Sequence, residues 1–301
     1  MNFKETMMAC SLCPRECAAD RTSDRLGWCK STDKVKIARA ALHFWEEPCI
    51  SGDKGSGTIF FSNCNLGCVY CQNYDISHDG NGLEVDQERL TEMMLNLGRM
   101  AHNVNLVTPA HYISQISGAL REAKFRGLKC PVVYNTNGYE KVESLKMLEG
   151  LVDIYLPDIK YFKDSYAVRY SKANRYFELA SAAVEEMLRQ TGHLYIGPDG
   201  MACKGLLVRH LVLPGMYEDS VEILRWIRKH LGKYIHLSVM AQYCPNKHLE
   251  RYCEIDRKIT REEYEMVVDE VYDLGFENVY LQDLESASSE YTPPFDLTGV
   301  I

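Results

Sequence analysis

Short β-prone runs alternate with amphipathic helical stretches along most of this chain of 301 residues. Strand, helix and strand in this order require parallel strands joined by right-handed crossovers. The sequence therefore predicts an α/β fold, a partial (β/α)6 TIM-like parallel barrel with a small Cys-rich N-terminal segment. The predicted strands are 58–61, 104–107, 131–134, 153–156, 206–213, 234–240 and 279–281. The predicted helices are 85–100, 112–126, 141–148, 163–172, 175–191, 221–231 and 261–274.

Polar residues follow the predicted strands at their carboxyl ends, where parallel barrels place their active sites. Taken singly, each of them has an ordinary structural role as a turn, a cap or an ion-pair partner. Together they are expected to line one pocket. They are residues 64–71, Thr108–His111, Asn135–Asn137, Asp158–Lys160, Arg209 and Gln242–Tyr243.

Three cysteines, Cys64, Cys68 and Cys71, follow the first predicted strand directly with the spacing C-x3-C-x2-C. Buried free cysteine often packs as a small hydrophobe, but that role does not explain a cluster within eight residues among Asn and Gly. Three thiolates are one ligand short of the four that close a zinc or iron–sulfur site. The pattern predicts a metal centre with one open position for another ligand.

A second cysteine cluster lies near the N-terminus, at Cys10, Cys13, Cys17 and Cys29. The surrounding residues favour turns and contain too few apolar side chains for a separate core, so a metal is the expected staple. Four cysteines suit either structural zinc or an auxiliary iron–sulfur cluster, and their spacing does not decide between the two. Unpaired thiols are the less favoured alternative.

The predicted organisation has three parts. Residues 1–50 form the Cys-rich segment with a structural metal site, residues 51–285 form the barrel, and residues 286–301 form a tail over the surface. Ahead of the barrel, His43 and the glutamates Glu46 and Glu47 are candidate cavity groups. A strand or helix end with solvated charges is the favoured interpretation of that stretch.

The composition excludes several classes of protein. The formal net charge is −8, which argues against a nucleic-acid or anionic-membrane surface. No apolar run approaches the roughly 20 residues of a membrane helix, and residues 1–5 lack the apolar core of a signal peptide. We therefore expect a cytoplasmic protein whose twelve cysteines are thiols or metal ligands.

The cysteine triad, with Tyr70 before its last member, resembles the signature of the radical S-adenosylmethionine (SAM) superfamily. Gly55–Ser62 and Gln72–Asn73 resemble the activating enzymes of glycyl-radical proteins. More narrowly, the chain resembles PflX-type relatives of pyruvate formate-lyase activating enzyme. Those relatives combine C-x2-C-P-x2-C, here from Cys10, with H-x2-E-E-P-x-I-S-G, here from His43. The resemblance covers nearly the whole chain.

The resemblance implies a [4Fe-4S] cluster held by Cys64, Cys68 and Cys71, with SAM bound to the fourth iron. One electron then cleaves SAM to methionine and a 5′-deoxyadenosyl radical, which abstracts hydrogen from a substrate. The residues implied at SAM are Tyr70 near the adenine, and Asn135, Asp158, Lys160 and Arg209 at the ribose and methionine.

The chain departs from the superfamily pattern at one place. A Gly-Gly-Glu-Pro stretch usually follows the second strand and meets the amino group of SAM, whereas this chain has Val107-Thr108-Pro109-Ala110-His111 there. Thr108 and nearby backbone carbonyls are the expected substitutes.

The function implied is a radical SAM oxidoreductase that abstracts hydrogen, with a glycyl-radical protein as substrate and flavodoxin or ferredoxin as electron donor. Two alternatives stay open: an enzyme acting on a small molecule or peptide, and a non-catalytic iron–sulfur redox sensor. Cys244 is either a thiol near the substrate or, as favoured, an inert half-buried cysteine.

Overall fold

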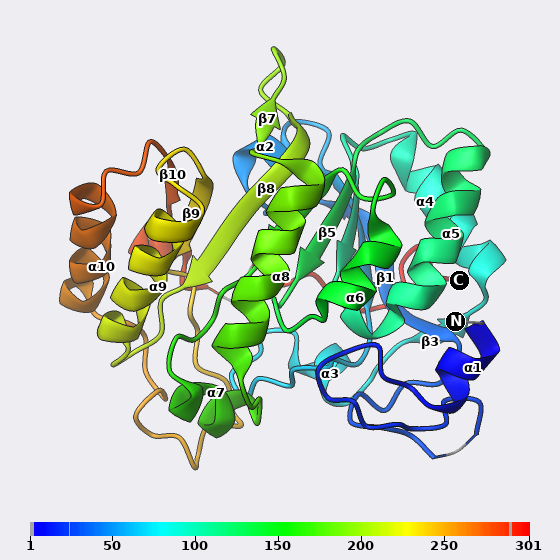
Figure 1. The fold of residues 1–301 in the computed structure, drawn as a ribbon, viewed down its shortest axis with the longest axis horizontal. Helices are drawn as coiled ribbons and strands as arrows, with labels where there is room; N and C mark the ends of the chain where they lie inside the picture. The colour runs from blue at the N-terminus through cyan, green and yellow to red at the C-terminus, as the bar shows by residue number, and fades with distance from the viewer. Residues whose placement is uncertain (1–2, 24, 289–290) are drawn as a thin grey trace.

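A ten-stranded, mostly parallel sheet forms the centre of the computed structural model, which describes residues 3–23, 25–288 and 291–301. Helices cover its outer face, and the N-terminal loops lie along one edge (Figure 1). The strands are β1 Val35–His43, β2 Ser56–Phe61, β3 Leu83–Val85, β4 Val104–Val107, β5 Val132–Thr136, β6 Ile154–Pro157, β7 Tyr195–Ile196, β8 Ala202–Leu211, β9 His236–Met240 and β10 Asn278–Leu281.

Most of the helices lie in the connections between parallel strands. None of the described helices is long and apolar enough to cross a membrane. The helices are α1 Phe3–Met8, α2 Pro48–Ser51, α3 Tyr74–Ser77, α4 Gln87–Gly98, α5 Ile113–Phe125, α6 Val142–Leu145, α7 Asp164–Ser171, α8 Tyr176–Thr191, α9 Tyr217–His230 and α10 Arg261–Asp273. Short 3-10 turns lie at Ala110–Tyr112, Lys146–Leu148 and Leu284–Ser286.

The α/β prediction is confirmed. Seven strands run parallel in the order β2-β4-β5-β6-β8-β9-β10, and every step between neighbours is a crossover that contains at least one helix. The strand order ends at β10 on one side and at β3 on the other, and no pairing among the described residues joins these ends. The sheet is therefore an open, partial barrel.

Several elements differ from the sequence prediction. β1 and β3 add an antiparallel extension beside β2, and β7 forms a small antiparallel pair with β8. β8 begins at Ala202 rather than at residue 206, because its first residues pair with β7. β1 falls within the predicted segment 1–50 yet belongs to the barrel sheet, and the division at residue 50 stays a prediction.

The core lies between the sheet and the covering helices, where the helical periodicity places its apolar residues. In α4, the predicted positions Leu90, Met93, Met94 and Leu97 are all buried. Asp86 caps this helix by accepting a 2.8 Å hydrogen bond from the backbone N–H of Arg89. The apolar stripe and its cap explain why this helix packs where it does.

The C-terminal tail covers the edge of β1. The Leu297 N–H donates to the Ala38 carbonyl, and the Ala40 N–H donates to the Thr298 carbonyl at 2.9 Å. Gly299 has φ 74°, and a Cβ there would clash with the Ala40 carbonyl. These contacts pair the part of β1 that the short β3 leaves open. Residues 289–290 of the predicted tail lie outside the described residues.

His210 of β8 packs against the outer helices and is neutral in the fold. Its Nδ1–H donates to the Ile159 carbonyl at 2.7 Å, and Nε2 lies 2.8 Å from the Ser220 hydroxyl. Burial lowers the pKa of His210 to about 4. Between about pH 6.5 and about pH 4, the imidazole of His210 binds a proton in the unfolded chain but stays neutral in the folded chain. Acid therefore destabilises the fold.

Replacement of His210 by Asn, whose amide keeps the donor, should flatten this pH dependence. For each unit by which the pH is lowered in this window, we expect the free energy of unfolding of the variant to fall by about 1.4 kcal/mol less than that of the wild type. Denaturant titrations between pH 4.5 and 6.5 measure the difference. The surface variant His230→Asn serves as the control, and parallel pH slopes for His210→Asn and the wild type would contradict the assignment.

Candidate functional site

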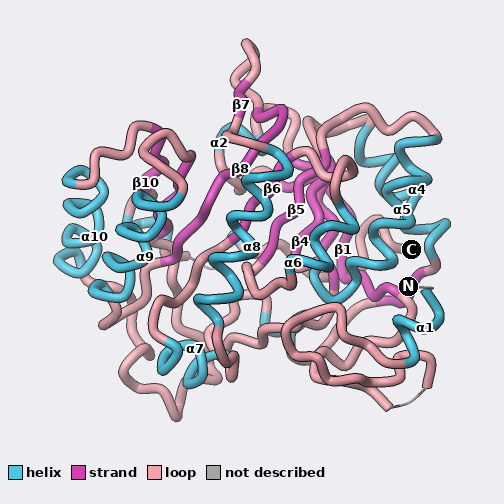
Figure 2. The backbone as a smooth tube through the Cα atoms, in the orientation of Figure 1, coloured by secondary structure: helices cyan, strands magenta, loops and turns pink. Residues whose placement is uncertain are grey.

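A cavity of about 620 Å³ lies at the carboxyl ends of the parallel strands. Figure 1 shows that β8 points toward the edge where α3, α7 and the N-terminal loops lie. Figures 1 and 2 both show α2 at the opposite edge. The cavity is lined by all three cysteines of the triad and by every residue that the sequence analysis assigned to SAM. The predicted pocket is therefore assembled by the fold.

The loop that carries the triad is built from turns. Asn63 and Gly67 both adopt positive φ, at 70° and 73°, and so turn the chain sharply after β2. The Cys64 sulfur accepts from the Leu66 backbone N–H at 3.3 Å and from the Asn137 side-chain amide at 3.4 Å. These donors stabilise negative charge on sulfur, as a metal-bound thiolate carries.

Burial raises the pKa of the Cys64 thiol to about 12 and also raises the pKa of Cys71. The neighbouring Cys68 adds to both shifts, because two thiolates repel one another. Without a metal, Cys64 and Cys71 are thus protonated at neutral pH. Metal binding must release these protons.

A chain of buried hydroxyls reaches the third cysteine. Tyr70 and Tyr161 share a 2.8 Å hydrogen bond, Tyr161 lies 2.7 Å from the Ser171 hydroxyl, and Ser171 donates to the Cys68 sulfur at 3.1 Å. Tyr70 is also packed edge-on against Tyr243. This network fixes the ring of Tyr70 at the cavity wall and gives Cys68 a donor of its own.

Two side chains from distant parts of the sequence hold the backbone of the triad loop. Arg15, from the N-terminal segment, donates to the carbonyls of Asn65 and Leu66, both at 2.9 Å. It also donates to two carbonyls at the end of α7, and its guanidinium lies 3.9 Å from the Trp28 ring centroid. Asn246 donates to the Val69 carbonyl at 3.1 Å and to that of Cys71. Sequence patterns did not identify either residue.

Replacement of Arg15 by Ala is expected to loosen the triad loop. The loop carbonyls and the end of α7 lose their shared donor, so metal retention at the triad should fall about 10–100-fold. The rate at which a chelator removes iron from the reconstituted protein measures this loss. Arg25→Ala is the matched control, because Arg25 is an exposed cation of the same segment. Equal rates for both variants would show that Arg15 does not hold the loop.

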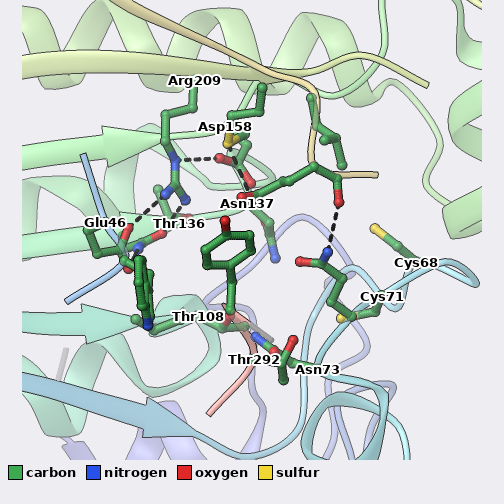
Figure 3. Close-up of a pocket in the computed structure, with 18 of the residues that line it drawn as sticks. Glu46, Cys68, Cys71, Asn73, Thr108, Thr136, Asn137, Asp158, Arg209 and Thr292 are labelled. Atoms are coloured by element: carbon green, nitrogen blue, oxygen red, sulfur yellow. Dashed lines mark hydrogen bonds and ion pairs between the residues drawn. The ribbon is translucent and has the colours of Figure 1, made fainter. Parts of the chain in front are cut away.

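A charged network occupies the end of the cavity opposite the cysteines (Figure 3). Arg209 of β8 uses all three guanidinium nitrogens: Nε donates to Asp158 at 2.9 Å, Nη1 to Glu46 at 3.0 Å and Nη2 to Asn135 at 2.6 Å. The Asn135 amide in turn donates to Glu46 at 3.1 Å. These contacts use three of the five N–H donors of the guanidinium, and through them Arg209 organises the neighbouring side chains.

Lys160 is better placed than Arg209 to meet a ligand. Its ammonium donates to Asp158 at 2.7 Å, and this is the one hydrogen bond of its three donors among the described residues. Burial disfavours the charged Lys160, but Asp158 outweighs that cost and raises its pKa. Burial likewise opposes ionisation of Asp158, yet Arg209 and Lys160 hold the pKa of that carboxyl below its usual range. Both groups are charged at neutral pH.

Thr108 has strained backbone geometry. It follows β4 directly with φ 59°, which is unusual for a β-branched residue. Its N–H donates to the Asn135 carbonyl at 2.9 Å, and the residue lines the cavity. Strain of this kind tends to persist where function requires it, which agrees with the predicted role of Thr108.

The cysteine triad and the polar residues of the cavity fit the implied cofactors, a [4Fe-4S] cluster and SAM. In a [4Fe-4S] cluster each cysteine binds a different iron, so the three sulfurs need only face a common cavity, as they do. SAM carries a carboxylate, an amine and ribose hydroxyls. The ammonium of Lys160 suits the carboxylate of SAM. The oxygens of Asp158, Asn135 and Glu46 suit its amine and its ribose hydroxyls.

The four N-terminal cysteines are neighbours. Cys13 is buried, and its pKa rises to about 12, first through burial and then through Cys29, Cys10 and Cys17. However, the described residues, the triad included, contain no group of three or more His, Cys, Asp or Glu side chains placed to hold a single metal ion. The structure therefore brings these cysteines near each other without forming the tetrahedral site of a bound zinc.

Three features of the cavity were missed or underrated in the sequence. Glu46 and Glu47 point into it rather than into solvent, and His43 also lines its wall. Tyr291–Pro293 of the tail reach the same wall, where Trp45 contacts Tyr291 at 5.0 Å between ring centroids. Cys244 also lines the cavity and is half-buried, as favoured. In the sequence, the signal for the two glutamates of the cavity was their position as a pair directly before a proline.

Comparison with known proteins identifies the family. The family model described as Radical SAM superfamily matches residues 58–227, which is more than half of the chain. The chain belongs to the radical SAM superfamily. The superfamily prediction is thereby confirmed, and the three triad cysteines lie within the matched residues. The narrower PflX-type resemblance rests on the motifs alone.

Among curated proteins, this radical SAM chain is similar to the uncharacterized protein MJ0674 of Methanocaldococcus jannaschii. The two are 29% identical over 276 residues, which cover 88% of this chain and 75% of the relative.

Among solved structures, the chain is similar to SuiB of Streptococcus suis bound to S-adenosylmethionine, with a TM-score of 0.53 and 13% identity. That match covers 75% of this chain but only 50% of SuiB, so the chain spans half of the SuiB chain. Methylornithine synthase gives a TM-score of 0.50 and 14% identity, and covers 81% of this chain and 72% of that one. At such identities the likeness shows the fold alone.

Proposed function

We propose that this protein is a radical SAM enzyme that cleaves SAM reductively and abstracts a hydrogen atom from a substrate. The observation that carries the proposal is the single cavity that holds both the open cysteine triad and the polar residues suited to SAM. When bound, the [4Fe-4S] cluster and SAM supply the electron and the carbon radical for this chemistry.

The residues of the chain have distinct parts in this function. Cys64, Cys68 and Cys71 hold the cluster. Lys160 and Asp158 bind the polar groups of SAM, and Tyr70 packs at the adenine. The apolar and aromatic wall of the cavity excludes water and stray hydrogen donors from the reacting carbon.

For the substrate we propose a glycyl-radical protein, with flavodoxin or ferredoxin as the electron donor, since the motifs resemble those of glycyl-radical activating enzymes. One observation favours the alternative of a small molecule or short peptide. A protein loop needs an open mouth, but Tyr291–Pro293 of the tail form part of the wall of this cavity. The cytoplasmic location, and the absence of nucleic-acid and membrane partners, stay predictions of the composition.

The test of the enzyme is anaerobic reconstitution with iron and sulfide, followed by reduction in the presence of SAM. We expect 5′-deoxyadenosine to form. A reduced, intact cluster that yields none would overturn the proposal and favour the redox sensor.

The test of the substrate is electron paramagnetic resonance after incubation with candidate glycyl-radical proteins captured by anaerobic pull-down. A glycyl-radical doublet supports activation of such a protein. Hydrogen abstraction from small molecules or peptides in the absence of that signal supports the alternative.

We further propose that Cys10, Cys13, Cys17 and Cys29 bind a metal, because the fold places them as neighbours in a segment with little core of its own. Metal analysis of a Cys10→Ser/Cys13→Ser double variant tests this. Loss of one zinc supports a structural site, and loss of about four irons supports an auxiliary cluster. Unchanged metal content would exclude both.

A further inference from the structure

Two aromatic rings cover the triad loop at Gly67. A Cβ at Gly67 would lie 3.7 Å from the Trp28 ring and 3.9 Å from Nε2 of His78, so both rings lie close to this residue. Gly67 directly precedes Cys68 and carries no side chain, and therefore only backbone separates the rings from a triad cysteine. Trp28 is 40% exposed. Packed atoms thus lead from solvent to the triad loop by a short path.

A column of three stacked rings continues this surface. Tyr74 lies between His78 and His248, at 4.1 Å and 3.6 Å between ring centroids and with interplanar angles of 1° and 12°. Tyr74 follows Cys71 by three positions, and His248 follows Asn246, which donates to the backbone of the triad loop. All three rings are half-buried. We call this surface the triad-loop face; it consists of Trp28, Lys30, Tyr74, His78, Lys172 and His248.

The cations of the triad-loop face are free of acidic partners. Lys30 and Lys172 are exposed, and neither forms an ion pair with a carboxylate of the described residues. The ammonium of Lys30 donates to the His78 carbonyl at 3.3 Å, and that of Lys172 lies 6.0 Å from the Trp28 ring centroid. The guanidinium of Arg15 lies against the same ring at 3.9 Å.

The charge of this face differs in sign from that of the whole chain, which is −8. Two exposed acids, Asp75 and Asp79, adjoin Tyr74 and His78. They are outnumbered by Lys30, Lys172 and Arg15 on the face and by the exposed Lys247 beside His248. Local positive charge on an acidic protein favours an acidic partner at this surface.

We propose that the triad-loop face docks an acidic protein that carries one electron. The inference rests on the proposed radical SAM function, which needs an electron from outside the chain, and it names the surface and the charge of the donor. The reduced carrier loses one electron to the triad site and is oxidised, and no bond forms or breaks.

The composition of the face suits such a complex. Exposed Trp and Tyr rings supply contact area at protein interfaces, while surrounding cations orient the partner. Electron-transfer complexes are small and transient, so a few rings and cations are sufficient. Electrons cross most readily where the path is short and well packed, as it is between Trp28, Gly67 and Cys68.

Calorimetric titration of the cluster-reconstituted protein with oxidised flavodoxin, an acidic carrier, tests the face without turnover. Cytochrome c, a basic carrier, is the comparison probe. At low ionic strength we expect flavodoxin to bind at least about tenfold more tightly, and added salt should reduce this preference. No binding of flavodoxin, or a preference for cytochrome c, would overturn the proposal.

A Lys30→Glu/Lys172→Glu double variant reverses two charges of the face and should weaken flavodoxin binding at least about tenfold. The matched control is Lys204→Glu/Lys229→Glu, which makes the same charge change at exposed positions at the start of β8 and shortly before β9. Trp28→Ala should also weaken binding, because exposed Trp residues often dominate interfaces, and it keeps the test available if the double variant fails to fold. Equal affinities for the double variant and its control contradict the docking face.

The rate of reduction separates docking from damage to the triad site. Absorbance after anaerobic mixing with reduced flavodoxin should show a rate at least about tenfold lower in the Lys30→Glu/Lys172→Glu variant than in the wild type. Photoreduced 5-deazariboflavin is small and needs no docking, so its rate should be equal in both proteins. Equal losses with both reductants, or no loss with flavodoxin, would overturn the proposal.

Formation of 5′-deoxyadenosine with photoreduced 5-deazariboflavin is measured independently. Its absence removes the proposed function itself. Its presence in the wild type, together with unimpaired flavodoxin binding in the double variant, removes the docking face but leaves the enzyme.

Discussion

Replacement of Cys68 by serine is expected to abolish cluster binding and, with it, cleavage of SAM. Cys68 is one of three thiols that one short loop presents to the cavity, and no fourth cysteine of that loop can replace it. Loss of a hydrogen bond to a metal ligand typically lowers affinity about 10–100-fold, so loss of the ligand itself should exceed that range. Iron content after reconstitution and the yield of 5′-deoxyadenosine measure the effect.

Cys203→Ser is the matched control, because Cys203 is exposed and lies on β8 outside the cavity. It should retain both iron and activity. Loss of Ser171, which donates to the Cys68 sulfur, should leave the cluster bound but shift its reduction potential. A Cys68→Ser protein that keeps its full iron content would contradict the assignment of the triad.

Replacement of Arg209 by glutamine is expected to destabilise the fold strongly and to weaken SAM binding. Arg209 is the shared partner of Asp158, Glu46 and Glu47, and its removal leaves the two glutamates without their cation, while Asp158 keeps Lys160. Breaking a buried ion pair in this way typically costs about 3–5 kcal/mol. Denaturant unfolding measures this loss, and anaerobic titration with SAM measures the change in affinity.

Arg225→Gln provides the comparison on the surface. Arg225 also pairs with two carboxylates, Glu222 and Glu270, both at 2.9 Å, but it is exposed. We expect its replacement to cost less than about 1 kcal/mol. Arg209→Lys should rescue little, because an ammonium cannot reproduce the three-way fork. Equal losses for Arg209→Gln and Arg225→Gln would show that the buried network does not stabilise the protein.

The destabilisation by Arg209→Gln should also shrink in acid. In the variant, Glu47 loses the guanidinium that opposes the effect of burial, so its folded pKa rises further above the unfolded value, whereas Asp158 keeps its ion pair with Lys160 at 2.7 Å. The folded state then binds more protons than the unfolded state, so stability relative to the wild type improves as the pH falls. A difference that grows in acid would contradict this account.

The periodicity of apolar residues was sufficient to predict the strands, the main helices and their parallel order. This periodicity is a local property of the sequence. An apolar residue at every third or fourth position, or a short run of β-branched residues, depends only on neighbouring positions. Thr58–Phe61, Val104–Val107 and the stripe in α4 were identified on this basis. β1 and β3 could not be placed, because their partners are set by antiparallel pairing across the sheet.

The sequence by itself determined the cysteine triad and the residues at the strand ends, because a fixed spacing and a fixed periodicity carry that information. The class of chemistry followed from the resemblance of these motifs to a known superfamily. Only the tertiary structure decided which distant groups meet there. Arg15 reaches Asn65 from 50 positions away, and Arg209 meets Glu46 across 163 positions. Contacts at such separations arise from chain topology and packing, and no local pattern of residues encodes them.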